Sequence, residues 1–374
     1  MISRGSNMQK IRVLILGGYG GAGSSISRLL LQETDCDIVV AGRHEAKALD
    51  LSERLNAKFP GARASGVFAD ASQSESLELA LQGVDLIISA STSLDYVEVV
   101  AKAALQENID YLDIHYPQQR VAVLRNLAEQ IKAQGRCFIT QAGFNPGLPS
   151  VLVRLAKSHF TRYEKARVGV AMNTRFEKGD ALNEFLDSLG DFRSDLFREG
   201  RWSKARVTDA VTFDFGHTLG KKQCYPMSLE EMWALPEMLG LEELGLYGAG
   251  MNWFVDYLVI PAAFVLGNVQ NGLGREILAS LMVNALERFS PLQEEVAVVM
   301  EAVGNDDAGP KNVRIAVRHN DAYFITAAPV VACVRQYLQE KMPSGLNIMG
   351  HSVDPEILIK DLQRMGVEVE CSLR

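Results

Sequence analysis

Residues 11–23 read Ile-Arg-Val-Leu-Ile-Leu-Gly-Gly-Tyr-Gly-Gly-Ala-Gly, a mostly apolar run that ends in a glycine-rich stretch. The run of Ile11–Leu16 predicts a buried β-strand. The next residues, Ser24–Thr34, place apolar side chains at helical spacing, so the glycines connect a strand to a helix. Gly18–Gly23 fits the pattern G-x-G-x-x-G, and this strand–turn–helix context predicts a dinucleotide-binding Rossmann domain.

Each glycine of the pattern has its own task. Gly18 permits the tight turn, Gly20 lets the backbone approach a pyrophosphate, and Gly23 lets the helix pack closely on the strand. The loop residues Tyr19, Gly21 and Ala22 complete the expected cofactor-binding segment. There the helix N-terminus presents amide groups and its positive dipole end to phosphates. The alternative is a glycine-rich turn that binds no ligand.

The end of the second strand indicates which dinucleotide is bound. An NAD-binding domain usually carries Asp or Glu about 20 residues beyond the glycines, where it bonds the ribose 2′-hydroxyl. This chain has Ala41-Gly42-Arg43 there, and a guanidinium can bond the 2′-phosphate of NADP(H). Gly42 is expected to leave room for the ribose, and Asp70 is a candidate for the adenine amino group. Alternatively, Arg43 only caps a surface strand and Asp70 is an ordinary loop aspartate.

The first 150 residues repeat the strand–helix pattern. Strands are expected at 11–16, 37–41, 66–69, 85–90, 110–114 and 137–140, and helices lie between them. The fold class is therefore α/β, with a doubly wound parallel Rossmann sheet in residues 9–150.

The pattern changes beyond residue 150. Alternating runs at 207–215, 296–302 and 313–317 predict a second, α+β domain over residues 151–325, built on a largely antiparallel sheet. Turn-forming residues at 304–310 predict a hairpin loop longer than the tight two-residue kind. The glycine cluster at 245–250 is expected to be a loop. Residues 326–374 are expected to return to the Rossmann domain, with a helix that begins after Asp354 and stops at Gly366.

Composition narrows the class of protein. The chain has 374 residues, 47% hydrophobic and 22% charged, with a net charge of −8 and no basic stripe, so a nucleic-acid partner is not expected. The five cysteines are scattered and never spaced as C-x-x-C, which favours a reducing cytoplasm and no metal site. The most apolar stretch, Trp253–Leu266, is too short to span a bilayer and predicts a buried or interface helix.

Several of these segments together resemble the saccharopine dehydrogenase family, in its NADP-dependent reductase branch. The matching segments are 13–23, 41–43, 85–90, 111–113 and 143–148, and the closing 345–369 is similar again. The family usually has Asp before its proline-glycine turn, whereas this chain has Asn145. The resemblance implies hydride transfer between a nicotinamide and a carbon–nitrogen bond of an amino-acid-derived substrate. The nicotinamide would lie beyond strands four and five, beside Ser91 and Thr92.

The candidate catalytic groups follow the fifth strand. Hydride transfer needs a nearby proton donor or acceptor, and histidine is matched to neutral pH. Asp113 and His115 lie two residues apart on an extended segment and so face the same side, where one could orient or charge the other. Tyr116 and Asn145 are candidates to hydrogen-bond the substrate. Alternatively, Asp113 caps the next helix and His115 is a solvated loop residue.

The sequence therefore predicts an NADP(H)-dependent oxidoreductase with a small-molecule substrate, located in the cytoplasm and forming a homodimer. Two other interpretations remain open: a redox sensor that binds NADP(H) without turnover, and a reductase of carbonyl or enoyl groups.

Overall fold

The computed structural model describes residues 10–91, 94–175, 182, 186, 194–269 and 273–373, and the chain divides into two compact units. Unit 1 comprises Met1–His115, Ala122–Thr140 and Val334–Asn347. Unit 2 comprises Tyr116–Val121, Gln141–Cys333 and Ile348–Arg374. These divisions run differently from the expected boundaries at 150 and 325. Of the C-terminal segment expected on the Rossmann domain, residues 334–347 lie in unit 1 and residues 348–374 in unit 2.

Unit 1 is built on a seven-stranded sheet in the order β15-β6-β5-β4-β1-β2-β3. The strands are β1 (Arg12–Leu16), β2 (Asp37–Gly42), β3 (Ala64–Phe68), β4 (Leu86–Ser89), β5 (Asp110–Asp113), β6 (Cys137–Thr140) and β15 (Gly345–Ile348). The pairings from β6 through β1 to β3 are parallel, and they place the carboxyl ends of these strands along one edge. The predicted Rossmann sheet is confirmed, with one strand, β15, added from the C-terminal part of the chain.

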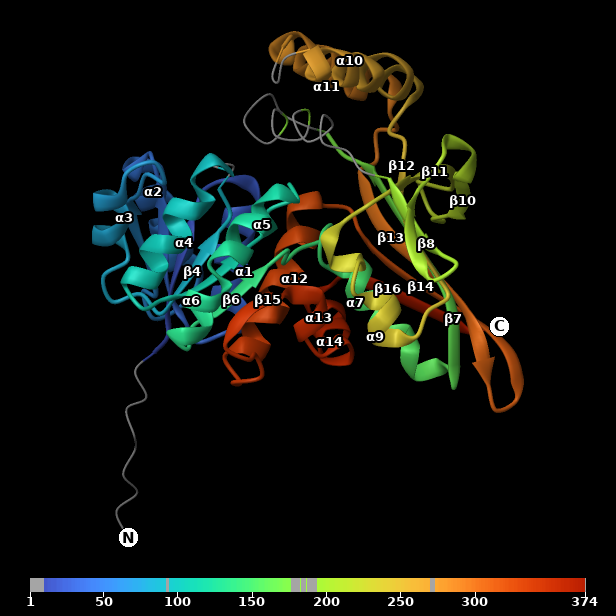
Figure 1. Ribbon diagram of the computed structural model, residues 1–374. Coiled ribbons are helices and arrows are strands. Elements are labelled where there is room, and N and C mark those ends of the chain that lie inside the picture. The colour runs from blue at the N-terminus through green and yellow to red at the C-terminus, as the bar shows by residue number, and fades with distance from the viewer. Residues whose placement is uncertain are drawn as a thin grey trace. The chain divides into compact units, whose positions relative to one another are not determined.

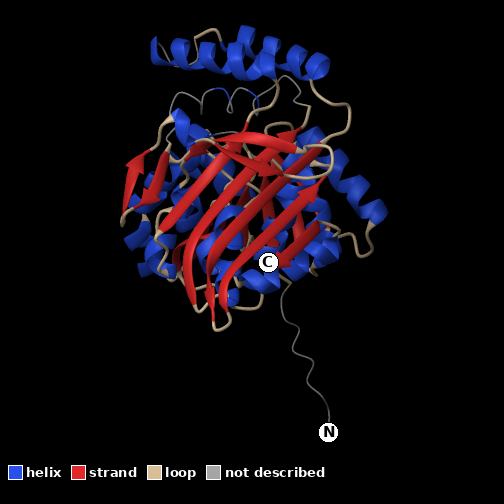
Figure 2. Cartoon of the chain, turned by 90° about the vertical axis from the view of Figure 1, so that its right-hand side faces the viewer, coloured by secondary structure: helices blue, strands red, loops and turns tan. Residues whose placement is uncertain are grey.

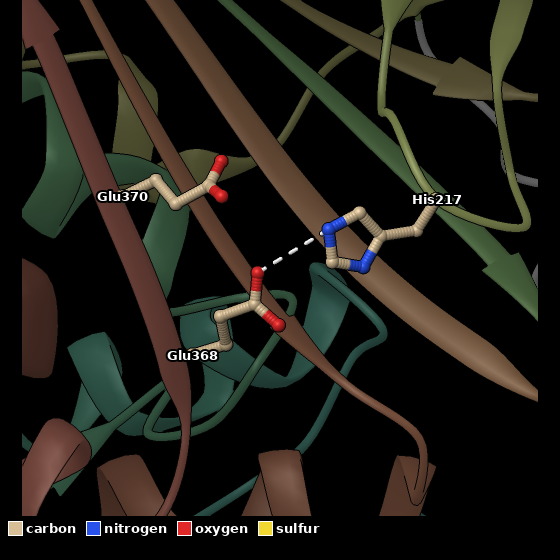
Figure 3. A group of neighbouring side chains, drawn as sticks. All are labelled: His217, Glu368 and Glu370. Carbon is tan, nitrogen blue, oxygen red and sulfur yellow. Dashed lines mark ion pairs between the residues drawn. The ribbon is translucent and has the colours of Figure 1, made fainter.

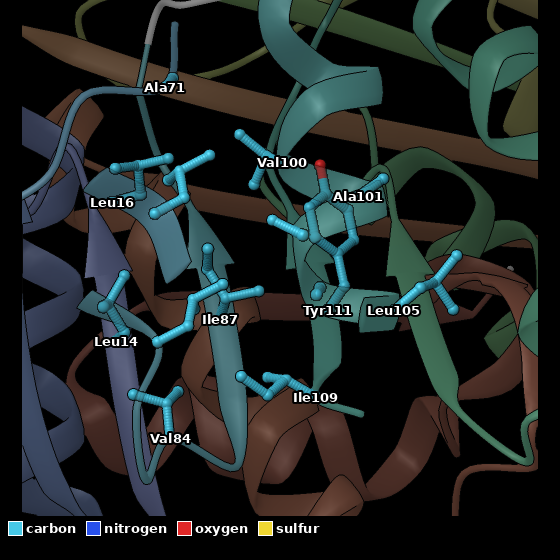
Figure 4. Packing of buried hydrophobic residues seen from close by; sticks show 14 of the residues in the cluster. Leu14, Leu16, Ala71, Val84, Ile87, Val100, Ala101, Leu105, Ile109 and Tyr111 are labelled. Atoms are coloured by element: carbon cyan, nitrogen blue, oxygen red, sulfur yellow. The ribbon is translucent and has the colours of Figure 1, made fainter. Parts of the chain in front are cut away.

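The helices of this part of the chain connect consecutive strands (Figure 1). They are α1 (Gly21–Glu33), α2 (Glu45–Lys58), α3 (Ser74–Ala80), η1 (Leu94–Tyr96), α4 (Val97–Gln106), α5 (Gln119–Asn126) and α6 (Ala128–Ala133). Apolar side chains of the strands pack against those of the helices, as Figure 4 shows for Leu14, Ile87 and Val100. Strands buried in this way read as continuous apolar runs, which is why the sequence pattern located them.

Unit 2 is built on a nine-stranded sheet, which Figure 2 views from its broad side. Its main path runs β10-β11-β12-β7-β13-β14-β16, and β8 pairs with β12 and β9. The strands are β7 (Arg162–Asn173), β8 (Asp195–Arg198), β9 (Arg201–Lys204), β10 (Val211–Asp214), β11 (Lys221–Met227), β12 (Glu243–Ala249), β13 (Glu295–Asp306), β14 (Gly309–His319) and β16 (Glu368–Leu373). Among the described strands of this second sheet, only β12 and β7 pair in parallel. The predicted largely antiparallel sheet is therefore confirmed.

Helices and helical turns complete the described part of unit 2. They are α7 (Leu148–Ala156), η2 (Lys157–His159), η3 (Val207–Asp209), η4 (Glu230–Met232), α9 (Leu235–Leu239), η5 (Val255–Val259), α10 (Ile260–Val269), α11 (Arg275–Phe289), α12 (Ala322–Tyr337), α13 (Met349–Ser352) and α14 (Pro355–Met365). The last four residues of α12 belong to unit 1. No helix among the described residues is long and apolar enough to cross a membrane.

Two sequence-based expectations for this unit are wrong. The β13–β14 hairpin has a two-residue loop, because the strands continue pairing as far as Asp306 and Gly309 through a region rich in turn-forming residues. Residues 245–249 of the glycine cluster belong to strand β12, which lies in the interior of the sheet. A Cβ on Gly245 would lie 2.6 Å from the Tyr247 ring and 2.8 Å from Leu196, so side-chain packing explains this glycine.

The expected ends of α14 are confirmed. The Asp354 side chain accepts a hydrogen bond from the backbone amide of Ile357 at 3.0 Å, and Pro355 begins the helix. Gly366, with φ of 103°, ends it in the left-handed conformation. The chain then enters β16, which pairs antiparallel with β14.

Candidate functional site

The glycine loop lies at the carboxyl end of β1 and opens helix α1. A Cβ on Gly23 would lie 2.2 Å from the carbonyl oxygen of Gly17, so this glycine allows the helix to approach the strand. Gly18 is equally restricted, since its Cβ would lie 2.7 Å from the Ile15 carbonyl oxygen. Apart from its neighbours in the chain, a Cβ on Gly20 would meet only the Gly17 carbonyl oxygen within 4 Å among the described residues, at 3.2 Å. The first amides of α1, from Gly21 onward, have no partner within the helix, so they are suited to bind phosphate oxygens.

Sequence reasoning missed the part played by Gly17. Its φ is 79°, and a Cβ there would lie 2.8 Å from both the nitrogen and the Cα of Ser91. The backbone just beyond β4 therefore lies directly against the glycine loop, and Ser91 is adjacent to the expected cofactor site. Thr92, the other residue named there, lies outside the described residues.

Tyr19 spans from the glycine loop to the turn after β2. Its hydroxyl accepts a hydrogen bond from the backbone amide of His44 at 3.0 Å, and the Nζ of Lys47 lies 5.9 Å from its ring centroid. A Cβ on Gly42 would lie 2.6 Å from the ring. Gly42 therefore makes room for the Tyr19 side chain in this structure, where the sequence had suggested room for a ribose.

Arg43 and Asp70 follow neighbouring strands, β2 and β3, at the same edge of the sheet. Arg43 is exposed. The Asp70 carboxylate accepts hydrogen bonds from Ser72, through its backbone amide at 3.0 Å and its hydroxyl at 2.8 Å, and from the Gln73 side chain at 3.2 Å. The backbone hydrogen bond of Ser72 chiefly lowers the pKa of Asp70, and the charge of Arg43 lowers it further. The Asp70 carboxylate thus organises its own loop beside Arg43.

A buried polar cluster occupies the carboxyl ends of β4, β5 and β6. Its centre is Asp113, which is fully buried and accepts hydrogen bonds from the His115 backbone amide at 3.2 Å and the Thr140 hydroxyl at 2.9 Å. The His115 Nδ1 lies 3.9 Å from the Asp113 Oδ2, and its Nε2 lies 3.4 Å from the Ser89 hydroxyl. The two predicted catalytic side chains are therefore neighbours, and Ser89 and Thr140 are members of the cluster that sequence reasoning missed.

The burial of this cluster excludes the alternative of a solvated loop histidine, because His115 is only 5% exposed. Helix α5 begins at Gln119, beyond the reach of an Asp113 cap. Tyr111, two residues before Asp113 on the same face of β5, is also fully buried. Burial and then the charge of Asp113 raise the pKa of the Tyr111 phenol well above its usual range, so this hydroxyl keeps its proton.

The proline-glycine turn lies in unit 2, at the start of α7. Asn145 and Pro146 are joined by a cis peptide bond, and Gly147 is the N-cap of the helix. Gly147 has φ of 128°, and a Cβ there would lie 2.4 Å from the Gly143 carbonyl oxygen, so only glycine fits. The Asn145 Oδ1 is buried and has no hydrogen-bond partner among the described residues. A buried acceptor in this state is suited to a donor from a ligand.

Tyr116 also belongs to unit 2, in the short segment Tyr116–Val121. Burial raises the pKa of its phenol to about 12, so the hydroxyl is protonated at neutral pH and can donate a hydrogen bond.

The same unit contains a buried carboxylate that sequence reasoning missed. Glu231, in η4, is fully buried and accepts hydrogen bonds from the backbone amides of Gly147 (2.9 Å) and Ser150 (3.3 Å), and from the Ser150 hydroxyl. Burial raises its pKa to about 7. The turn and Glu231 are more than 80 residues apart in sequence, and no local pattern connects them.

One further group of side chains has the composition of a metal site. His217, Glu368 and Glu370 offer ligand atoms within 4.8 Å of one another (Figure 3). However, the guanidinium of Arg318 lies 3.1 Å from Glu368 and 2.9 Å from Glu370. The hydrogen bond from Arg318 lowers the pKa of Glu370, and the same guanidinium pairs with both carboxylates. We interpret the group as an ion-pair network that links β16 to its neighbours.

Comparisons with known proteins bear on the nucleotide-binding domain and on the fold. Residues 13–139 match the family model for the saccharopine dehydrogenase NADP binding domain. The fold is similar to that of saccharopine dehydrogenase (L-Glu forming) from Saccharomyces cerevisiae, with a TM-score of 0.72 and 13% identity over 97% of this chain and 100% of that one. An engineered D-amino acid dehydrogenase bound to NADP+ matches with a TM-score of 0.48 and 13% identity, over 96% of this chain and 100% of that one. No curated protein matches the sequence.

The glycine loop, the parallel sheet and the matched domain define an NADP-dependent oxidoreductase. Residues 13–139 match the saccharopine dehydrogenase NADP binding domain, so the predicted resemblance and the predicted cofactor, NADP(H), are confirmed.

Proposed function

We propose that this chain catalyses hydride transfer between NADP(H) and a carbon–nitrogen bond of an amino-acid-derived substrate. The observation that carries the proposal is the buried pair of Asp113 and His115 at the carboxyl ends of the strands in the NADP-binding sheet. Open α/β sheets bind their ligands at this edge. The resemblance to the saccharopine dehydrogenase family supports the choice of a carbon–nitrogen bond.

The residues present suit the cofactor. The glycine loop at Gly20 and the amides of α1 would receive the pyrophosphate, and Arg43 would pair with the 2′-phosphate. Ser91, whose backbone lies against the glycine loop, would lie beside the nicotinamide half. When bound, the nicotinamide supplies or accepts the hydride.

The proton that accompanies the hydride is assigned to His115. Reduction of a carbon–nitrogen double bond adds hydride to carbon and leaves the electron pair on nitrogen, which then takes a proton. An imidazolium is matched to this task near neutral pH. Asp113, 3.9 Å from the His115 Nδ1, would stabilise the charged ring and set its orientation, while Ser89 lies at the other ring nitrogen.

Two residues of unit 2 are assigned to substrate binding. The protonated Tyr116 hydroxyl would donate a hydrogen bond, and the unpaired Asn145 Oδ1 would accept one from an N–H group. An amide in place of the family's usual carboxylate removes a negative charge from this position. The proposed substrate therefore presents a hydrogen-bond donor to Asn145 without needing a cationic group there.

The test is NADPH oxidation with pairs of an L-amino acid and a 2-oxo acid, which together supply an imine. We expect turnover with at least one pair, and no oxidation with either partner alone. Tight NADPH binding without turnover on amine, carbonyl and enoyl panels would instead favour the redox sensor. Turnover on carbonyl or enoyl compounds alone would favour the other reductases.

We extend the proposal to a cytoplasmic homodimer. Exposed apolar side chains gather on η5, α10 and α11, among them Tyr257 (71% exposed), Val265 (65%) and Ile277 (68%). Contiguous apolar patches of this kind are typical of interaction surfaces. Light scattering of the purified protein tests the proposal: a mass of two chains supports it, and a mass of one chain at micromolar concentration contradicts it.

A further inference from the structure

Two consecutive residues of η4 make hydrogen bonds to the two segments that carry the proposed substrate residues, one residue to each segment. Glu231 bonds to the turn that contains Asn145, and Glu230 bonds to the segment that begins at Tyr116. All of these residues belong to unit 2. The proposed chemistry uses neither glutamate, so their arrangement requires a separate explanation.

The contact to the Asn145 turn uses the whole Glu231 carboxylate. One oxygen accepts the Gly147 amide at 2.9 Å, two residues after Asn145. The other oxygen accepts hydrogen bonds from the amide and the hydroxyl of Ser150, in the first turn of α7. A carboxylate is stabilised at a helix N-terminus because it meets unpaired amides and the positive end of the helix dipole. Glu231 thereby fixes the backbone on the C-terminal side of Asn145.

The contact to the Tyr116 segment runs through Gln118. The Glu230 backbone amide donates to the Gln118 Oε1 at 2.7 Å, and the Gln141 side chain donates to the same oxygen at 2.8 Å. The Gln118 Nε2 in turn donates to the Tyr116 carbonyl oxygen. A displacement of η4 would therefore be transmitted to the backbone of Tyr116 as well as to the turn.

The far side of η4 is held by α13. The His351 Nε2 lies 2.6 Å from the Glu231 carbonyl oxygen, and burial lowers the pKa of this histidine, so a neutral ring donates there. Arg154 of α7 donates to the carbonyl oxygens of Gly350 and Val353 at 2.8 and 2.7 Å. Polar contacts thus hold η4 from both sides.

A fully buried carboxylate is expensive, because burial removes water from its charge. A leucine could fill the same volume but would leave the amides of Gly147 and Ser150 without an acceptor. What the carboxylate adds is a fixed geometry for the turn relative to η4, and through Gln118 for Tyr116 as well.

We propose that Glu231 is a positioning residue of the proposed reaction, which holds the Asn145 turn and the Tyr116 segment in a fixed relation through η4. The inference rests on the proposed function in assigning Asn145 and Tyr116 to the substrate. The coupling of the two segments through Glu231 can be tested without any substrate.

The first experiment is amide hydrogen exchange, read by mass spectrometry on the full chain. Glu231→Gln places an amide group where the carboxylate accepts from Ser150, so it opposes the Ser150 backbone amide donor to donor and loses that hydrogen bond. We expect about tenfold faster exchange in both 116–121 and 143–150, with peptides of β1 and β4 unchanged. Ser150→Ala, which removes one donor and keeps the carboxylate, should give a smaller effect in the same segments. Glu237→Gln, at an exposed position of the neighbouring helix α9, is the matched control and should change neither.

Unchanged exchange in both segments, or faster exchange confined to 143–150, would overturn the proposal, because Glu231 would then be no more than a helix cap. A second measurement separates positioning from general stabilisation. With the pair of L-amino acid and 2-oxo acid that the wild type turns over fastest, Glu231→Gln should raise KM about tenfold. The same variant should leave kcat within about threefold and the Kd of NADPH within about twofold.

Equal kinetic effects of Glu231→Gln and Glu237→Gln, or a loss of NADPH affinity in Glu231→Gln alone, would contradict a positioning role. A wild type without turnover on any pair would count against the proposed function. The exchange data would still decide whether Glu231 holds the two segments together.

Discussion

Glu231→Gln should change how the stability of the protein depends on pH. Burial raises the pKa of Glu231 from 4.5 to about 7, so between these values the folded state holds a proton that the unfolded state has released. The folded state is then stabilised at low pH, and this contribution is lost as the pH rises toward 7. A shift of this size corresponds to about 3 kcal/mol. Most of it, roughly 2.5 kcal/mol, falls between pH 5 and pH 8.

The assay is denaturant unfolding of the wild type and the variant at both pH values. The three tryptophans, Trp202, Trp233 and Trp253, all belong to unit 2, so intrinsic fluorescence reports on the unit that contains Glu231. Wild-type stability relative to Glu231→Gln should fall by roughly 2.5 kcal/mol from pH 5 to pH 8, because groups common to both proteins cancel in the difference. The control Glu237→Gln should follow the wild type. A difference that stays constant with pH would refute the reasoning.

Three further predictions concern the cofactor and the chemistry. Gly20→Val should fold, because the Gly20 φ of −70° suits any residue. The variant should lose NADPH binding in a fluorescence titration, because the valine side chain would take the space of the pyrophosphate. Retained affinity would place the nucleotide elsewhere. Arg43→Ala should lower affinity for NADPH by roughly 1.5–3 kcal/mol while leaving NADH affinity unchanged, and equal losses for both nucleotides would remove Arg43 from the 2′-phosphate site. Asp113→Asn should lower turnover by about 10²–10⁴-fold with NADPH affinity retained, and wild-type turnover in this variant would remove Asp113 from the mechanism.

The nucleotide-binding half of the fold was predictable because its determinants are local. The apolar run before the glycines, the helical spacing after them and Arg43 at the end of β2 are each visible within a few residues. The edge of a parallel sheet then brings together side chains that follow different strands, which is why Asp113 and His115 were found as a pair. Their neighbours Ser89 and Thr140 carry no signal of their own, since a hydroxyl at a strand end is common.

The second unit was less predictable because its contacts are distant in sequence. Turn-forming residues near 304–310 suggested a long loop, yet pairing with β7 and β14 extends the strand to Asp306. Likewise, the glycines of β12 are explained by side chains packed over them. In the sequence, Glu231 is one of two adjacent glutamates with apolar residues on either side, and only the fold places its carboxylate at the start of α7.

The most direct test of the central claim is to follow the hydride itself. NADPH deuterated at the transferring position of the nicotinamide is incubated with the protein and an L-amino acid plus 2-oxo acid pair, and the products are analysed by mass spectrometry. The account predicts a secondary amine in which one deuterium is bound to the carbon of the new carbon–nitrogen single bond. Deuterium found only in an alcohol or in a saturated carbon–carbon bond, or in no product at all while NADPH stays tightly bound, would contradict it.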